Sequence, residues 1–299
     1  MASTAIPWRA RLTAAMLKRA PDWPAFAATK AIGTAARLKL PRPVVGVAVS
    51  AYSRYYGVAL DEVDPLSHAR GYTSFDEFFT RQLRAGARPI DSGPDAIVSP
   101  CDGRLRGIAS ITGAADRVEA KGHDYTLGEL VGDNELAARC LGGEVVTIYL
   151  HPRDYHRVHT PVDGRVERVQ AIPGRLLPVT DASLRCEPRL FARNERLVHT
   201  LETERGPVVV VMVAAFGVGH MTCAYAPVPA HPRVPQTHRL ERAVELRRGE
   251  ELGRFHLGST VVMLVPPGCR TLESIRVDER SGRAVRLGEP LLTWRGAQA

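Results

Sequence analysis

From about residue 95 to the end, the chain carries its apolar residues in short β-branched runs that Gly and Pro separate. Residues 145–150 and 261–265 are typical runs, and the longest, residues 208–218, lies between Pro207 and Gly219. Runs of this length and composition, bounded by turn residues, are typical of buried strands. None reaches the roughly 18 apolar residues of a transmembrane helix. The sequence therefore predicts a β-rich core of many short strands.

The region before this core has helical spacing instead. Val45, Val49, Tyr52 and Tyr56 recur on one helical face within residues 8–56, which prolines cut into short pieces. Residues 44–49 are apolar enough to be a strand, so that alternative stays open. The predicted fold class is α+β: N-terminal helices followed by a β-rich core of short, mostly antiparallel strands.

One helix start has a specific signal. Ser74 is followed three residues later by Glu77, just before Phe78 and Phe79. This is a capping-box pattern. We expect a helix that begins here and ends near residues 83–86.

The positive charge of the chain is concentrated at its N-terminus. The formal net charge is +8, and residues 1–50 hold eight Lys or Arg but one acid, Asp22. A basic segment with aromatic residues suits an anionic membrane surface. A solvated tail, a nucleic-acid arm or a mitochondrial presequence would have a similar composition. We interpret residues 1–62 as a basic, helical, membrane-associating segment.

Four patches carry residues that can do chemistry. They are the turn around Asp102, the segment with His156 and His159, residues 191–196, and Gly258-Ser259. The histidines would face opposite sides of a strand but can converge in a turn. No Cys or acidic cluster repeats at metal-ligand spacing, so we expect no metal site.

Asp102, His159 and Ser259 occur in an order that allows a hydrolase-like triad. However, Ser259 does not lie in a Gly-x-Ser-x-Gly elbow. It follows Gly258 directly, so its hydroxyl can attack the Gly258 carbonyl, which no side chain obstructs. The ester that forms can eliminate and hydrolyse to leave a pyruvoyl group at a new N-terminus. A simple Gly-Ser turn before a strand is the alternative.

Together the patches resemble the bacterial phosphatidylserine decarboxylase family, over nearly the whole chain. Cys101 stands where the family usually has Ala, and residues 214–219 follow the family only loosely. The matching segments are residues 75–81, 88–90, 121–125, 152–159, 191–196 and 257–260, together with the Asp102 turn.

The resemblance implies roles for the site residues. Asp102, His159 and Ser259 would form the self-cleavage triad, with cleavage between Gly258 and Ser259. Ser259 would become the pyruvoyl group, and His156 would assist decarboxylation. Residues 63–299 would form the catalytic domain, cut into a 1–258 beta chain and a 259–299 alpha chain.

The implied reaction converts phosphatidylserine to phosphatidylethanolamine and CO2, which makes the chain a carboxy-lyase. A covalent pyruvoyl group would replace pyridoxal phosphate, for which Lys121 is the one lysine beyond residue 39. The implied partners are phosphatidylserine in an anionic membrane and the chain's own two fragments as a heterodimer, with no nucleic acid. Whether two heterodimers pair stays open.

We expect a peripheral location on the cytoplasmic face of a bacterial inner membrane. Two other functions compete with this interpretation. One is a serine hydrolase that uses Asp102, His159 and Ser259 without forming a pyruvoyl group. The other is a non-enzymatic basic protein that binds membranes.

Overall fold

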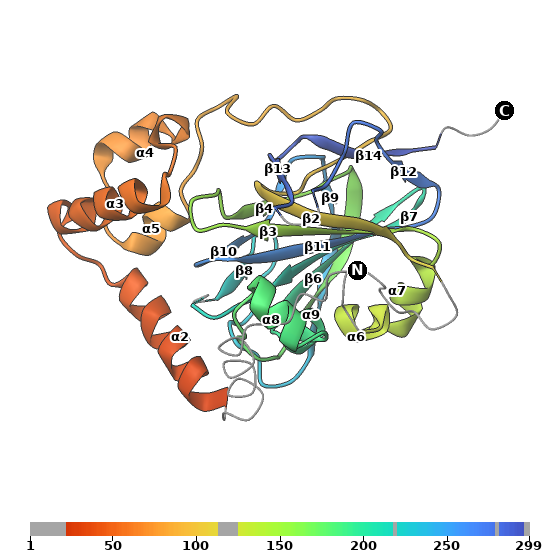
Figure 1. Cartoon of the computed structure of the whole chain (residues 1–299), viewed down its shortest axis with the longest axis horizontal. Helices are drawn as coiled ribbons and strands as arrows, with labels where there is room; N and C mark the ends of the chain where they lie inside the picture. The colour runs from red at the N-terminus through yellow and green to blue at the C-terminus, as the bar shows by residue number, and fades with distance from the viewer. Residues whose placement is uncertain (1–21, 113–124, 218–219, 279–280, 296–299) are drawn as a thin grey trace, which may run out of the picture.

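The computed structural model describes residues 22–112, 125–217, 220–278 and 281–295 (Figure 1). Within them, N-terminal helices lie beside a β-rich body whose strand pairs are all antiparallel. The predicted α+β class is confirmed. The basic residues before Asp22, and residues 121–124 of one family segment, lie outside the described residues.

An eight-stranded sheet forms the centre of the body. Its order is β13-β2-β3-β11-β7-β6-β5-β9, so strands far apart in the sequence are neighbours. The bounds are β13 (Arg283–Val285), β2 (Gly103–Ser110), β3 (Glu144–Leu150), β11 (Ser259–Val265), β7 (Gly206–Val213), β6 (Arg196–Thr203), β5 (Gly164–Ile172) and β9 (Gln236–Leu246).

Two three-stranded sheets flank the central one, in the orders β1-β14-β12 and β4-β10-β8. The second of them carries the histidine segment and leads directly into β11. The bounds are β1 (Ala96–Val98), β14 (Pro290–Trp294), β12 (Cys269–Thr271), β4 (Arg157–His159), β10 (Glu251–Phe255) and β8 (Met221–Cys223).

The predicted strand over residues 208–218 is β7, but it ends earlier, at Val213. The backbone N–H of Ala214 donates to the carbonyl of Glu195, and Gly217 has a φ of 84°. The chain therefore turns away from the sheet while its side chains are still apolar. Residues 218–219 lie outside the described residues.

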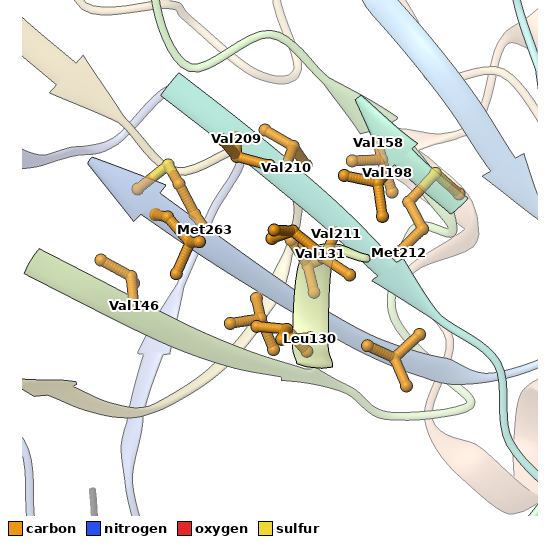
Figure 2. Close-up of a cluster of buried hydrophobic side chains, with 14 of the residues drawn as sticks. Leu130, Val131, Val146, Val158, Val198, Val209, Val210, Val211, Met212 and Met263 are labelled. Carbon is orange, nitrogen blue, oxygen red and sulfur yellow. The ribbon is translucent and has the colours of Figure 1, made fainter. Parts of the chain in front are cut away.

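Strand β11 lies in the interior of the core, enclosed by a neighbouring strand on each side. It pairs with β3 on one side and β7 on the other, and residues 261–264 have no exposed surface. In Figure 2, Met263 packs among valines of the neighbouring strands, and Leu130 and Val131 of α6 (Leu127–Val131) join the same cluster. A strand covered on both faces reads as an unbroken apolar run, as this one does.

The N-terminal helices pack around a second, smaller cluster, which consists of Val45, Val49, Val58, Tyr72 and Phe78. Residues 44–49 are helical, because they lie inside α3, whose Pro43 suits a first turn and which ends at left-handed Gly57. The helices are α2 (Asp22–Arg37), α3 (Arg42–Tyr56), the 3-10 turn η1 (Leu60–Glu62), α4 (Pro65–Arg70) and α5 (Phe75–Phe79).

Helix α5 begins where its capping pattern predicts. The Ser74 hydroxyl accepts from the Glu77 N–H at 3.1 Å, although the Glu77 carboxylate accepts from Thr73 rather than from Ser74. The predicted end near residues 83–86 is wrong, because the helix stops at Phe79. The next residues are drawn into extended pairing instead, with Leu83 bridged to Val63.

Three further short helices complete the described chain: α7 (Asn134–Arg139), α8 (Asp181–Cys186) and α9 (Leu190–Arg193). The segment at residues 191–196 ends α9 and starts β6. Asn194 is fully buried, and its side chain bonds both backbone groups of Leu177 and the carbonyl of Ala214. Arg196 donates only to backbone carbonyls, including that of Leu130. These family residues therefore hold loops together.

Candidate active site

The segment that contains Gly258 and Ser259 links β10 to β11. Ser259 is the first residue of β11 and lies opposite Leu150 in the ladder. Leu257 has a φ of 88°, in the left-handed region that residues other than glycine rarely adopt. A Cβ built on Gly258 would lie 3.9 Å from Nε2 of His156. The structure thus brings His156 next to the predicted cleavage site.

The backbone at Leu257 is strained, and the residues on either side hold it there. A left-handed conformation costs a non-glycine residue about 1–2 kcal/mol. On one side, the ring of His256 donates from Nδ1 to Asp76 at 2.7 Å and stacks on His220 at 3.8 Å. On the other side, β11 is locked between two strands. Strain of this kind persists where the surroundings fix the chain from both directions.

His156 is fully buried and is held as a neutral imidazole. Its Nδ1–H donates to the carbonyl of Asp154 at 2.9 Å, and its ring packs on Phe79 at 4.1 Å. Burial, and then the charge of Arg81, lower the pKa of His156 to about 3. Nε2 is buried and has no hydrogen-bond partner within the part of the chain that the structure describes. An unprotonated nitrogen with a free lone pair therefore lies close to Gly258.

His159 lies at the other end of β4 from His156. Because β4 is a strand, the two histidines diverge: Glu251 is opposite His159, whereas the Phe255 N–H bonds to the His156 carbonyl. The His159 Nδ1–H donates to the carbonyl of Gly249 at 2.8 Å, and Nε2 accepts from the Tyr155 hydroxyl at 3.2 Å. Burial lowers the pKa of His159, so it too is neutral near pH 7.

Asp102 is engaged by other partners than His159. Its carboxylate accepts three hydrogen bonds from Arg88, at 2.8, 3.0 and 2.5 Å, and one from the backbone of Leu287 at 2.9 Å. The Gly249 carbonyl fixes the His159 tautomer, the task that the predicted triad gives to Asp102. The backbone still keeps the two close, since the His159 N–H bonds to the Pro100 carbonyl.

Several residues around the site were not singled out from the sequence. Arg88 lies within a quoted family segment, but its pairing with Asp102 and, at 2.7 Å, with Glu62 joins positions far apart in the chain. The contact of Asp76 with His256 is equally long-range. A positive φ at Leu257 has no signature in the sequence. The one available signal was the presence of Arg88 and Asp76 in segments that resemble the family.

Within the described residues, no three His, Cys, Asp or Glu side chains gather as metal ligands would. No helix in the same part of the chain is long and apolar enough to cross a bilayer.

Comparison with known proteins gives a consistent result. The family model described as phosphatidylserine decarboxylase matches residues 75–293. The chain belongs to the phosphatidylserine decarboxylase family. The predicted family and the predicted enzyme class, a carboxy-lyase, are confirmed.

Curated relatives match across most of their length. A phosphatidylserine decarboxylase proenzyme from Anaeromyxobacter sp. (strain K) is 42% identical over 274 residues, which is 90% of this chain and 94% of the relative. The proenzyme from Myxococcus xanthus (strain DK1622) is 41% identical over 271 residues, 89% of this chain and 93% of that one. The proenzyme from Methylibium petroleiphilum is 44% identical over 247 residues, 80% and 84% of the two chains.

The strain at Leu257 predicts a difference between two truncations. Leu257→Ala and Leu257→Gly both remove the side chain, but only glycine adopts the positive φ without penalty. In a Ser259→Ala background, which keeps the chain intact, the glycine variant should be more stable by about 1 kcal/mol. Urea unfolding measures this difference. An alanine variant as stable as the glycine variant would show that the backbone is not strained there.

The buried histidines predict acid sensitivity. Burial lowers the pKa of both His156 and His199 to about 3, so the unfolded chain binds protons below about pH 6.5 that the folded chain does not. The free energy of unfolding should therefore fall as the pH falls from 6.5 to 5, by up to ~1.4 kcal/mol per pH unit for each histidine. Urea unfolding across this range should give a shallower slope for His199→Gln. An unchanged slope in that variant would contradict the assignment.

Proposed function

We propose that this chain converts phosphatidylserine to phosphatidylethanolamine and CO2 through a pyruvoyl group that it makes by cutting itself between Gly258 and Ser259. One observation carries the proposal. A strained Leu257 lies just before buried strand β11, and among the described residues the imidazole nitrogen Nε2 of His156 beside Gly258 has no hydrogen-bond partner. That neutral, buried nitrogen also meets the need of a site where a hydroxyl must lose a proton.

The cleavage needs one base and no added cofactor. The Ser259 hydroxyl loses its proton, attacks the Gly258 carbonyl and replaces the amide with an ester. Elimination removes the Ser259 Cα proton, breaks the Cβ–O bond and forms a Cα=Cβ double bond, which releases Gly258 as a carboxylate. Hydrolysis of the remaining dehydroalanine releases ammonia and leaves a ketone on the new N-terminus. The release of strain at Leu257 favours the first step.

His159, oriented within a triad with Asp102, is our proposed base. In the described geometry its Nε2 is held by Tyr155, so that hydroxyl has to move before His159 can reach Ser259. His156 is already beside Gly258. The geometry therefore gives His156 a competing claim to the cleavage step.

Decarboxylation places different demands on the site. The pyruvoyl ketone, once formed, supplies the electron sink for the pair of electrons that CO2 leaves behind. We propose that His156 handles the proton that the substrate carbon then takes up. The pKa of His156 is about 3, well below the ordinary value of about 6.5 that would keep both protonation states accessible. In the uncut chain His156 therefore presents a lone pair, and it must gain a proton at Nε2 before it can donate one.

The two fragments would stay together after cleavage as a heterodimer of alpha and beta chains. Residues 259–299 supply β11 to the middle of the central sheet and β13 to its edge beside β2. They also supply β14, which pairs with β1. Separation of the fragments would break ladders in two sheets. The geometry thus favours the proposed catalytic domain of residues 63–299 remaining one body.

The N-terminal helices suit a membrane surface. Nine large apolar side chains of the described residues are exposed, and seven of them lie within residues 32–66. Basic residues of the same stretch would pair with anionic headgroups. We propose that residues 1–62 bind the cytoplasmic face of a bacterial inner membrane peripherally. The seven residues are Ile32, Leu38, Leu40, Val44, Val47, Tyr55 and Leu66.

Self-cleavage is tested with one matched pair of proteins. Wild type should separate under denaturing conditions into fragments 1–258 and 259–299 and should release CO2 from phosphatidylserine. Ser259→Ala should stay one chain and release none, while Ser281→Ala, an exposed serine elsewhere, should behave as wild type. An active wild type that remains a single polypeptide would rule out the pyruvoyl mechanism. An esterase activity in that intact chain would support the serine hydrolase instead.

The two histidines are separated by measuring cleavage and turnover on the same preparations. We expect His159→Ala to stay uncut because it lacks the base. His156→Ala should be cut but should release CO2 at least ~10²-fold more slowly, the lower scale of general acid catalysis. An uncut His156→Ala chain would transfer the base role to His156. A His156→Ala chain that is cut and fully active would show that His156 only packs against its neighbours.

Membrane binding is tested by vesicle sedimentation. Val47→Ser with Tyr55→Ser removes two exposed large side chains within residues 1–62, whereas Val234→Ser removes one outside the N-terminal helices as a control. The double variant should bind anionic vesicles more weakly than wild type, and high salt should weaken binding by both. Equal binding of all three proteins to neutral and anionic vesicles would contradict the proposed surface.

A further inference from the structure

A cavity of about 540 Å³ lies where the N-terminal segment meets the β-rich body. Gly57 and Glu62 form part of its wall, Arg104 and Tyr149 of β2 and β3 form another, and residues 284–286 form a third. Asp102 and Asp154 also reach it, so the cavity adjoins the candidate active site. None of the steps proposed above uses it.

The wall of this cavity is strongly basic. Three carboxylates line it, those of Glu62, Asp102 and Asp154. Twice as many guanidinium groups face them, so that positive charge is in excess. The arginines are Arg81, Arg88, Arg104, Arg106, Arg153 and Arg286.

The three carboxylates are already engaged by other arginines of the wall. Glu62 and Asp102 both accept from Arg88, and Glu62 also lies 3.3 Å from Arg286. Asp154 lies 3.8 Å from Arg153. Among the described residues, none of these carboxylates forms an ion pair with Arg81 or Arg104. Arg104 donates at 3.0 Å to the Ser281 carbonyl, which carries no net charge.

Arg81 is the most unusual of these groups, because it is 4% exposed and still lacks a carboxylate partner. One nitrogen, Nη2, donates to the carbonyls of Arg153 and Asp154 at 3.1 and 3.2 Å. Nε and Nη1 are buried, and no described residue hydrogen-bonds to either of them. The ring of Phe78, 5.2 Å from Cζ, offers partial compensation. A buried cation with unused donors is costly unless an anion completes it.

We propose that this cavity binds a phosphate group, with Arg81 and Arg104 among its ligands. The planar guanidinium fork matches a phosphate, which accepts two parallel N–H bonds from it. A phosphate would also offset the excess charge of the wall. Phosphodiester headgroups of lipids and free inorganic phosphate share this chemistry, and the experiment separates them.

The site does not depend on the proposed self-cleavage, but the two are connected. If the chain is cut after Gly258, Arg286 belongs to the smaller fragment, whereas Arg81 and Arg104 belong to the larger one. A phosphate held among them would then bridge the two fragments. Anion binding would therefore add to the strand pairing that keeps the fragments together.

The test is calorimetric titration of inorganic phosphate into the full chain at low ionic strength, with chloride at equal ionic strength as the blank. Wild type and Ser259→Ala should bind alike, which makes the result independent of cleavage. Arg104→Gln should bind at least ~10-fold more weakly, since it loses a charge-assisted contact. Arg239→Gln, an exposed strand arginine outside the cavity, should match wild type.

A second probe and a second variant complete the design. Glycerophosphoglycerol is a soluble phosphodiester: tighter binding than phosphate identifies a lipid headgroup as the ligand, and weaker binding identifies free phosphate. Arg81→Lys keeps the buried charge but not the fork, and it should also weaken binding while leaving the fold intact by circular dichroism. The proposal is overturned if neither probe binds wild type, or if both bind all variants equally.

Discussion

The position of β11 between β3 and β7 is the constraint on which the rest of the structure depends. Its side chains are fully buried along residues 261–264, so its register cannot slip without moving the core. Ser259 is the first residue of this strand. Because β10 belongs to a different sheet, the residues between β10 and β11 must carry the chain from one sheet to the other. Leu257 does so with a positive φ. The core thus places a strained residue two positions before Ser259, beside the bond that we propose is cut.

The polar groups around this bond are divided between two tasks. Asp102, Arg88 and Glu62 form an ion-pair network that joins the N-terminal segment to the Asp102 turn, and Leu287 ties in the last part of the chain. The histidines are instead held neutral by burial, each with its Nδ1–H on a backbone carbonyl. Charged groups therefore hold the segments together, whereas the histidines that we propose for proton transfer are neutral. The predicted triad would have to draw Asp102 from the first task into the second.

The sequence was sufficient for the fold class, the family and the start of α5, because these depend on local patterns. β-branched runs bounded by Gly and Pro predicted strands, and Ser74 with Glu77 predicted a cap. Contacts between distant segments were not predictable in this way. The partner of Asp102 is Arg88, the tautomer of His159 is set by Gly249, and α5 stops because Leu83 pairs with Val63. The low pKa of His156 follows from burial that no local pattern encodes.

The central claim of the proposal is that the chain cuts itself before Ser259 and converts this serine into a pyruvoyl group. The mass of the fragment that begins at residue 259, taken from protein purified without added cofactor, tests this most directly. The account predicts a fragment lighter by one ammonia than residues 259–299 with a serine N-terminus, and a carbonyl that borohydride reduces. A fragment that begins with an unmodified serine, or a chain with no break after Gly258, would contradict it.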